Sequence, residues 1–533
     1  MVNNKCFMPA LAPYARESED KDTAKTVNFN VLLIFFFSKT KKNLVSLFCL
    51  PHTCGMRRTL IEKLAKNNTM KKNLIFMATM ALALGSCGTN TPAGEGFNGT
   101  PGEVKLLTLD PGHFHAALVQ MYMYDEVDPT VHVYAPEGDD AQMHLDRIKI
   151  YNERSERPTS WNEVLYTGDD FLEKMIAEGK GNVVVLAGNN GKKTGYVKAA
   201  VDAGINVLSD KPMAIDQQKF AMLEQTLQEA PAKGSMVYDI MTERSEINNE
   251  LQRVLVANKD LFGEMEKGTP EDPAITKESV HHFFKYVSGQ PLRRPEWYFD
   301  VDQQGEGIVD VTTHLVDLVQ CTVMPEQEID YTKDIEFTSA RRWATPIPSD
   351  KYRLVTGQDE YPDFLLPDVV NDTLQVYSNG EMNYRLNGVN VRVSVVWNFM
   401  AEVGTEGTGD THYSVVKGTK ANIEIRQGAE QGYKPMLYVV SKMSDDAEAE
   451  STLRRTLRSL SNEYPGLDVK KTADHEWQVV IPSEIVKTHE QRFSSVMQVY
   501  LDYLKQGEIP AWERSQMISK YYTTTKALSI AKE

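Results

Sequence analysis

The feature that most constrains the fold is a series of short apolar runs, separated by helix-like segments, between residues 104 and 212. The clearest run, residues 181–187, has no charged side chain and ends at Gly188-Asn189-Asn190. Strands that are buried on both faces of a parallel sheet have this composition. Because strands alternate here with helices, such as those expected at residues 114–124 and 193–203, the sequence predicts a doubly wound α/β domain. Such domains bind ligands beyond the carboxyl ends of their strands.

The pattern changes after residue 236 to longer strands whose side chains alternate in polarity. Examples are residues 373–377, 389–396 and 421–425. Alternation with a period of two is typical of a sheet that has only one face covered. We therefore expect a first domain over residues 104–236 and a second α/β domain over residues 237–533.

The balance of charge separates the beginning of the chain from the rest. Of 58 Lys+Arg and 74 Asp+Glu residues, 13 and 5 respectively lie in residues 1–86, which leaves a formal charge of −24 on the remainder. An acidic surface repels phosphate backbones, so nucleic acid is not an expected partner. The five cysteines lack the spacing of a zinc site, and no metal site is predicted.

Residues 70–87 have the pattern of an export signal. Lys71 and Lys72 precede an apolar stretch, and Leu84-Gly-Ser-Cys87 resembles the cleavage site of a bacterial lipoprotein. The resemblance implies cleavage before Cys87, lipid attachment to its sulfur, and a mature protein on the periplasmic side of a bacterial membrane. Residues 1–69 are then a leader that is disordered or that results from a start codon assigned too early, residues 70–86 a signal peptide, and residues 87–103 a flexible tether.

The first turn of the α/β domain is the expected position for the phosphates of a dinucleotide. Glycines at this turn allow backbone amides at the helix start to approach the pyrophosphate. The turn has only Gly112, and Asp110 and His115 stand where the outer glycines would be. We predict cofactor contacts from Gly112, His113 and Phe114, and a ribose contact from Glu137, which follows the second strand. The pattern does not distinguish NAD from NADP.

Two further motifs carry a resemblance to a known family. Residues 204–214, which contain Asp210-Lys211-Pro212, resemble the GKxVxxEKPxA signature of the glucose-fructose oxidoreductase and inositol dehydrogenase (Gfo/Idh/MocA) family, with Asp in place of Glu. Residues 305–317 are similar to its GGGxxxDxGxHxxD stretch and keep Asp310, His314 and Asp317. The resemblance extends over about residues 104–530 and implies a Rossmann domain followed by a domain with an open-faced, largely antiparallel sheet.

The resemblance also implies a chemistry, namely NAD(P)-dependent oxidation of a sugar hydroxyl. That reaction needs a base for the O–H proton while the C–H hydride leaves, and an imidazole suits the task, so His314 is the candidate base. By resemblance, Asp310 orients the hydroxyl or the imidazole, and Lys211 contacts the reacting oxygen. The residues expected to line the nicotinamide side are Asn189, Asn190, Asp210, Lys211 and Pro212.

Cationic and aromatic side chains near the second motif are candidates for substrate binding, because sugars present hydroxyl groups and apolar faces. These candidates are Tyr238, Arg244, Lys285, Arg294 and Trp297.

Three other functions are compatible with the sequence. Transient oxidation followed by elimination would give net cleavage of a glycoside, and the incomplete glycine turn would also suit a sugar-binding lipoprotein without catalysis. His113-Phe-His115, together with Asp110, resembles the HxH motif of metal-dependent hydrolases. The expected partners are a small carbohydrate and the membrane through the lipid anchor, with a homo-oligomer as a further possibility. In an exported protein we expect NAD or NADP to be tightly bound.

Overall fold

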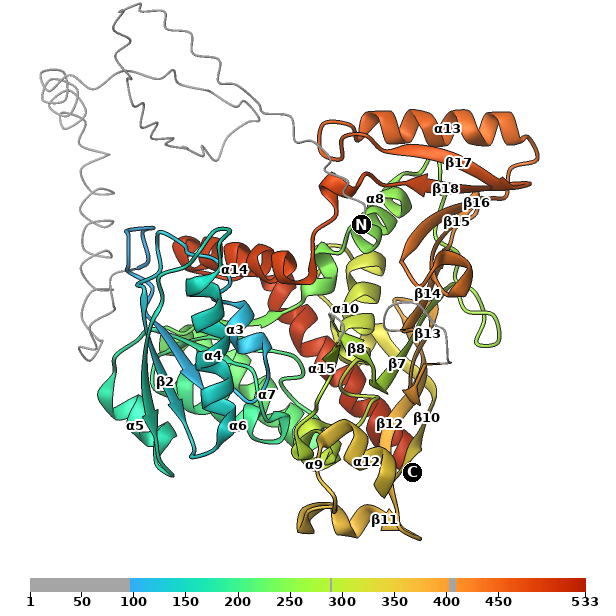
Figure 1. Cartoon of the computed structure of the whole chain (residues 1–533). Coiled ribbons are helices and arrows are strands. Elements are labelled where there is room, and N and C mark those ends of the chain that lie inside the picture. Colours follow the sequence, from blue (N-terminus) through green and yellow to red (C-terminus); the bar gives the residue numbers. More distant parts are fainter. Residues whose placement is uncertain (1–95, 288–289, 402–408) are drawn as a thin grey trace, which may run out of the picture. The chain divides into compact units, whose positions relative to one another are not determined.

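The computed structural model describes residues 96–287, 290–401 and 409–533 (Figure 1). The predicted leader, the signal peptide and Cys87 lie outside these residues, as does most of the predicted tether. Within the described part of the chain, no helix combines the length and the apolar character that a membrane crossing requires.

The first half of the described chain forms a six-stranded parallel sheet. Its order is β3-β2-β1-β4-β5-β6, and the strands are β1 (Leu106–Leu109), β2 (Thr130–Ala135), β3 (Asn162–Thr167), β4 (Val183–Leu186), β5 (Asn206–Asp210) and β6 (Val237–Ile240). The strands β1, β4, β5 and β6 are buried along their whole length, and β1 and β4 consist almost entirely of apolar residues. This arrangement confirms the predicted doubly wound sheet, and its last strand lies beyond the domain boundary predicted at residue 236.

Helices connect these strands: α3 (His115–Leu118), α4 (Asp139–Glu153), α5 (Phe171–Glu178), α6 (Asn190–Asp202) and α7 (Gln217–Glu229). Helix α3 has a single turn, although we expected a helix over residues 114–124. The helix does not continue because the backbone carbonyls that follow it accept hydrogen bonds from side chains of other segments. The carbonyl of Gln120 accepts the indole N–H of Trp161, and the carbonyl of Met121 accepts the guanidinium of Arg154.

The second half is built on a large, mostly antiparallel sheet of order β10-β12-β13-β7-β14-β15-β16-β18-β17, in which only β13 and β7 pair in parallel. The strands are β7 (Ile275–Phe284), β10 (Ile335–Pro348), β12 (Thr373–Leu386), β13 (Val389–Met400), β14 (Thr411–Lys417), β15 (Ala421–Gln427), β16 (Met436–Ser441), β17 (Asp468–Ala473) and β18 (Glu476–Val480). Short strands β8 (Tyr286–Val287) and β9 (Gln290–Pro291) pair with each other, and β11 (Val369–Val370) pairs with β12. The mostly antiparallel sheet confirms the fold expected for this half.

Helices pack on one face of the large sheet. The helices of this half are α8 (Ile247–Ala257), α9 (Val301–Gln304), α10 (Thr312–Val323), α11 (Tyr331–Asp334), α12 (Ser349–Thr356), α13 (Asp446–Ser459), α14 (His489–Gln506) and α15 (Ala511–Lys532). Leu251 of α8, Val316 of α10 and Leu528 of α15 share one hydrophobic core with strand residues such as Val393 and Ile423.

The last two helices return to the first sheet. Phe493 and Tyr500 of α14 and Tyr521 of α15 belong to the hydrophobic core of the parallel sheet, whereas Ala527 of α15 belongs to the core of the large sheet. Helix α15 therefore packs into both cores, and Figure 1 shows it running between them. This packing holds the carboxyl ends of β1 and β5 beside the loop that leads into α10.

Candidate active site

Lys211 and Asp310 meet where the two halves of the chain come together. Lys211 directly follows β5, and Asp310 lies in the loop before α10. The Nζ atom of Lys211 is 2.5 Å from Oδ1 of Asp310, and both side chains are largely buried. The other oxygen of Asp310 accepts a hydrogen bond of 3.0 Å from Nε2 of Gln304. Removal of either charge would leave the other buried without its partner, which is strongly destabilising.

His314, in the first turn of α10, is close enough to Lys211 to be affected by its charge. Burial and, secondly, the positive charge of Lys211 hold the pKa of His314 well below its ordinary value. Its Nδ1 atom is buried and has no hydrogen-bond partner in the part of the chain that the structure describes. The imidazole is therefore neutral near pH 7 and has a lone pair that can accept a proton.

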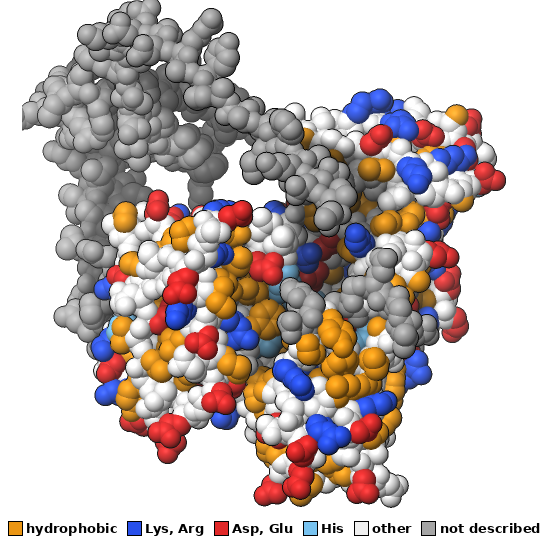
Figure 2. Space-filling model, viewed as in Figure 1, with side chains coloured by type: hydrophobic (Ala, Val, Ile, Leu, Met, Phe, Trp, Pro, Cys, Tyr) orange, Lys and Arg blue, Asp and Glu red, His pale blue; other side chains and the backbone are white. Residues whose placement is uncertain are grey.

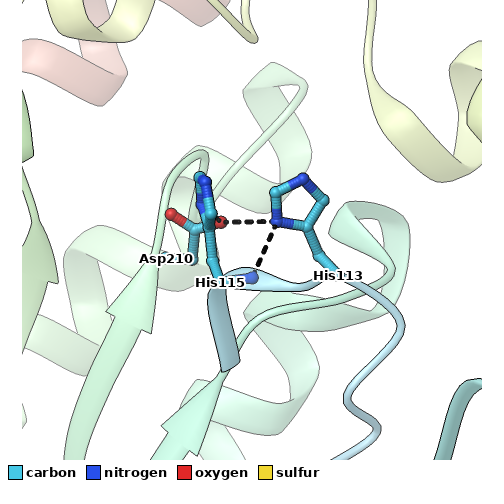
Figure 3. A group of neighbouring side chains, drawn as sticks. All are labelled: His113, His115 and Asp210. Carbon is cyan, nitrogen blue, oxygen red and sulfur yellow. Dashed lines mark hydrogen bonds and ion pairs between the residues drawn. The ribbon is translucent and has the colours of Figure 1, made fainter. Parts of the chain in front are cut away.

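Three further side chains gather at the same sheet edge (Figure 3). His113 and His115 come from the turn after β1, and Asp210 is the last residue of β5. The Oδ2 atom of Asp210 is 3.0 Å from Nδ1 of His115 and 3.7 Å from Nδ1 of His113. Burial and the neighbouring His115 hold the pKa of His113 well below its ordinary value. Burial would raise the pKa of Asp210, but the two histidines and Lys193 hold it far below its usual range.

The start of α6 joins this edge to the second half. The side chain of Asn189 donates to Oε1 of Gln303 at 2.9 Å, and that of Asn190 donates to the carbonyl of Gln304 at 2.7 Å. Asn190 also accepts the ammonium of the buried Lys193 at 2.5 Å. Burial lowers the pKa of Lys193 to about 8. The two asparagines therefore position α9 and, through Gln304, the carboxylate of Asp310.

The turn after β1 determines how well the site fits a dinucleotide. The amide of Gly112 donates to the carbonyl of Asp110, and the amide of His113 donates to the carbonyl of Ala187. A Cβ atom on Gly112 would lie 3.0 Å from Oδ2 of Asp140. These amides are thus used within the protein, α3 is a single turn, and a carboxylate borders the turn. These residues do not form a glycine-rich cradle for a pyrophosphate. Lys211, Asp310 and His314, in contrast, fit the nicotinamide end of a dinucleotide.

Three other predicted cofactor residues, Glu137, Pro212 and Phe114, lie near the same edge. Glu137 follows β2 and is exposed, as a ribose contact would require. Pro212 follows Lys211 through a cis peptide bond. Phe114 precedes α3, is exposed, and lies against the ring of His115 with ring centroids 4.5 Å apart.

Arg294 and Trp297 lie close to the catalytic candidates. The guanidinium of Arg294 is 4.5 Å from the ring centroid of Tyr298 and 5.2 Å from that of Trp397. Tyr298 and Trp397 line one small cavity together with Asp310. Trp297 reaches the turn after β1, where one of its ring carbons is 3.3 Å from the Cβ position of Gly112. Both predicted residues therefore border the region between the halves.

The other three substrate candidates are held by protein groups. Lys285 forms an ion pair of 2.6 Å with Asp410, and Tyr238, which lies within β6 and not after it, stacks on Tyr500 inside the core. Arg244 binds both oxygens of Asp317 at 2.6 and 2.7 Å. It also binds the buried Glu513 at 2.6 Å. Packing therefore explains the position of Tyr238, and charge balance within the protein explains that of Arg244.

Some neighbours of the site had no sequence signal. His489, the first residue of α14, has its ring centroid 5.3 Å from that of His115, and burial and the charge of His115 lower its pKa to about 4. Gln304, which binds Asp310, is the other such neighbour. Only the pairing of distant segments places them here, so spacing along the chain could not identify them. In Figure 2, histidine atoms are visible between the two halves.

Two family models match the chain. Residues 132–239 match the family described as "Oxidoreductase family, NAD-binding Rossmann fold" (GFO_IDH_MocA), and residues 251–532 match "Putative oxidoreductase C terminal domain" (Oxidoreduct_C). The first match begins after β1 and the turn that departs from the glycine-rich pattern. No curated protein matches the sequence significantly.

Solved structures resemble the chain at two levels. A protein from Parabacteroides merdae ATCC 43184, described as a "putative oxidoreductase", is 56% identical with a TM-score of 0.80, and the alignment covers 82% of this chain and 99% of that one. An oxidoreductase domain protein from Kribbella flavida is 13% identical with a TM-score of 0.52, covering 80% and 97%. Levoglucosan dehydrogenase in complex with NADH and L-sorbose is 13% identical with a TM-score of 0.50, covering 80% and 96%. The last two share the fold.

Proposed function

The chain belongs to the Gfo/Idh/MocA family of oxidoreductases and contains its NAD-binding Rossmann domain, and on this premise we propose that it oxidises a hydroxyl group of a sugar or sugar derivative by hydride transfer to NAD or NADP. The observation that carries the proposal is the contact between Lys211 and Asp310, which joins the two family motifs at the carboxyl edge of the sheet.

The side chains at this edge have the properties that the oxidation requires. A bound nicotinamide would supply the hydride acceptor for the carbon that carries the hydroxyl. The neutral imidazole of His314 accepts the hydroxyl proton, and the ammonium of Lys211 stabilises the negative charge that develops on the oxygen. Asp310, held by Gln304, orients Lys211 through their contact.

Support for a sugar comes from the second half of the site. Arg294 and Tyr298 are only partly buried and lie against each other, so a cation and an aromatic side chain, which suit the hydroxyl groups and the apolar side of a sugar, are accessible here. The acceptor and donor groups of Asp310 and Gln304 border the same small cavity as the ring of Tyr298. The levoglucosan dehydrogenase of the same fold was crystallised with L-sorbose, which agrees with this substrate class.

The test is the reduction of NAD and NADP by the purified chain in the presence of a panel of sugars and glycosides, with the products identified by mass spectrometry. We expect K211Q to lower kcat by about 10²- to 10³-fold with little change in KM, because the ammonium acts mainly on charge that develops in the transition state. K219Q is the matched control, since Lys219 of α7 pairs with Asp216, the residue before that helix.

Three outcomes are informative. A keto sugar with reduced cofactor supports the proposal, and a cleaved glycoside without net cofactor reduction would replace it with transient oxidation and elimination. Equal activity of K211Q and the unmodified chain would contradict the assigned role of Lys211. Denaturing the purified chain and identifying any released nucleotide would show whether the cofactor is NAD or NADP and whether it stays bound.

We further propose that the protein is exported and anchored by a lipid on Cys87. The support is the sequence of residues 70–87, with its charged start, apolar stretch and cleavage site. In a bacterial host, the full chain should fractionate with membranes, and a C87S variant should be released from them. Recovery of both proteins in the same soluble fraction would contradict the anchor.

A further inference from the structure

The cluster of His113, His115 and Asp210 has the composition and geometry of a metal site. Each residue offers one ligand atom, and these atoms all lie within 4.8 Å of one another. We propose that the three side chains bind a divalent transition-metal ion of the zinc type at the carboxyl ends of β1 and β5. This proposal does not depend on the sugar or on the nicotinamide cofactor, because it concerns only the metal.

The separations between the ligand atoms suit a small cation. Two ligands that are each about 2.0–2.1 Å from a tetrahedral zinc ion lie about 3.3 Å apart. The two separations from Asp210, 3.0 Å to His115 and 3.7 Å to His113, lie on either side of this value. The third separation, between the ligand nitrogens of the two histidines, is no more than 4.8 Å, so small movements of the side chains would bring all three atoms to a common centre.

The ligand atoms already face one another. Figure 3 shows the Nδ1 side of the His113 ring turned toward Asp210 and toward the backbone nitrogen of His115. That backbone N–H donates to Nδ1 of His113 over a long 3.4 Å, so Nδ1 carries the lone pair of the ring, and a metal ion would displace only a weak hydrogen bond from it. At 3.7 Å, Asp210 is too far from His113 for a hydrogen bond. His115 and Asp210 are thus hydrogen-bonded to each other, whereas none of the described residues gives the His113 ring a hydrogen bond of comparable length.

The surroundings hold the ligands in place. The amide of His113 donates to Ala187 and its carbonyl accepts the amide of Ala116, which fixes the backbone on both sides. The ring of His115 packs against Phe493, with ring centroids 4.7 Å apart. Ligands that are positioned by packing and backbone bonds need little reorganisation when a metal binds.

The cluster is closed on one side and open on the other. The side chains of His115 and Asp210 are 12% and 7% exposed, whereas that of His113 is 30% exposed. Three protein ligands with an accessible side are the pattern of a catalytic zinc site, in which water or a substrate oxygen takes the remaining position. Asp210 directly precedes Lys211, so the metal would polarise an oxygen beside the Lys211–Asp310 pair.

The position also explains why the first turn departs from the glycine-rich pattern. In that pattern, backbone amides and the start of a long helix supply positive charge at this edge. Here the amides are used internally and α3 has only one turn. A bound cation would supply positive charge at the same place through side chains.

The experiment measures metal binding directly, without nicotinamide or sugar. The purified full chain is stripped with a chelator, and Zn²⁺ binding is followed by isothermal titration calorimetry and by metal analysis after dialysis. We expect about one tight equivalent for the unmodified chain, and at least a tenfold weaker affinity for H115Q and for D210N. The control H475N removes a histidine from the exposed turn between β17 and β18, where His475 pairs with Asp446, and should bind as the unmodified chain does.

A measurement on the unmodified chain guards against misfolded variants. Zn²⁺ should raise its thermal unfolding midpoint as the metal concentration rises above the dissociation constant, since a ligand that binds only the folded state stabilises it. The variants H115Q and D210N should show a smaller rise. Absence of binding to the unmodified chain, or equal binding to all four proteins, would overturn the proposal.

Discussion

At the scale of single residues, the site depends on the charge states that burial imposes. Lys211 and Asp310 form a close ion pair, whereas His314 beside them is kept neutral by burial and by Lys211. A neutral imidazole is available as a proton acceptor because it does not have to lose a proton before the reaction, although the lowered pKa also makes it a weaker base than a free imidazole. The division of roles between a charged amine and an uncharged base therefore follows from the positions of three side chains.

This division predicts a pH profile. Because the pKa of His314 lies well below its ordinary value, the imidazole stays unprotonated as the pH falls from 8 to 6, and kcat/KM should be nearly flat over this range. Activity should decline only when the pH falls through the lowered pKa. H314Q should reduce kcat/KM by about 10²- to 10⁴-fold and should remove the acidic decline.

Steady-state rates of the unmodified chain, H314Q and the exposed control H475N would check this. An acidic decline of the unmodified chain centred at or above pH 6.5 would contradict a lowered pKa at His314. A decline that persists unchanged in H314Q would assign the titration to another group.

At the scale of elements, the sequence predicted what local composition determines. The parallel strands could be predicted because residues such as Val183–Leu186 are uniformly apolar, and Lys211 and His314 could be assigned to one site because two motifs placed them there. The length of α3 could not be predicted, since it ends where Trp161 and Arg154 bind its following carbonyls from distant positions.

The same limit applies to charged side chains. Arg244 and Lys285 are residue types that often bind substrates. Here, however, they pair with Asp317, Glu513 and Asp410, which lie on other segments of the chain. The pair His113 and His115 was visible in the sequence, whereas Asp210, 95 residues later, was not an evident partner. Clusters that depend on tertiary contacts have no signature in local spacing.

Helix α15 offers a prediction at this scale. Its Lys520 is fully buried and forms ion pairs of 2.7 Å with Asp239 of β6 and 2.8 Å with Asp317 of α10. K520M would leave these carboxylates with only part of their counter-charge, so we expect a loss of about 3–5 kcal/mol in the free energy of unfolding.

Urea unfolding followed by circular dichroism measures this loss, and K526M on the same helix is the control, since no ion pair to Lys526 is found among the described residues. A loss below about 1 kcal/mol in K520M would show that Arg244 alone balances the buried carboxylates.

At the scale of the whole molecule, the chain holds several histidines in environments that disfavour their protonation. Burial lowers the pKa of His412 on β14 to about 3 and that of His489 on α14 to about 4. Burial also raises the pKa of Glu243 and Glu513. These buried carboxyl groups and the histidines affect stability in opposite directions as the pH falls, so a single histidine is best tested by comparison with its own variant.

His412 provides that comparison. Its folded pKa, about 3, lies below the unfolded value of about 6.5, so the unfolded chain binds the proton first as the pH falls. Stability should thus fall with pH from about 6.5 down to the folded pKa, by up to about 1.4 kcal/mol per pH unit, or about 2 kcal/mol by pH 5. In H412Q this contribution is absent. Relative to the unmodified chain, H412Q should therefore gain about 2 kcal/mol between pH 7.5 and pH 5 in urea unfolding. The exposed control H475N should show no such gain, and a constant difference between H412Q and the unmodified chain at both pH values would mean that His412 titrates alike in the folded and unfolded states.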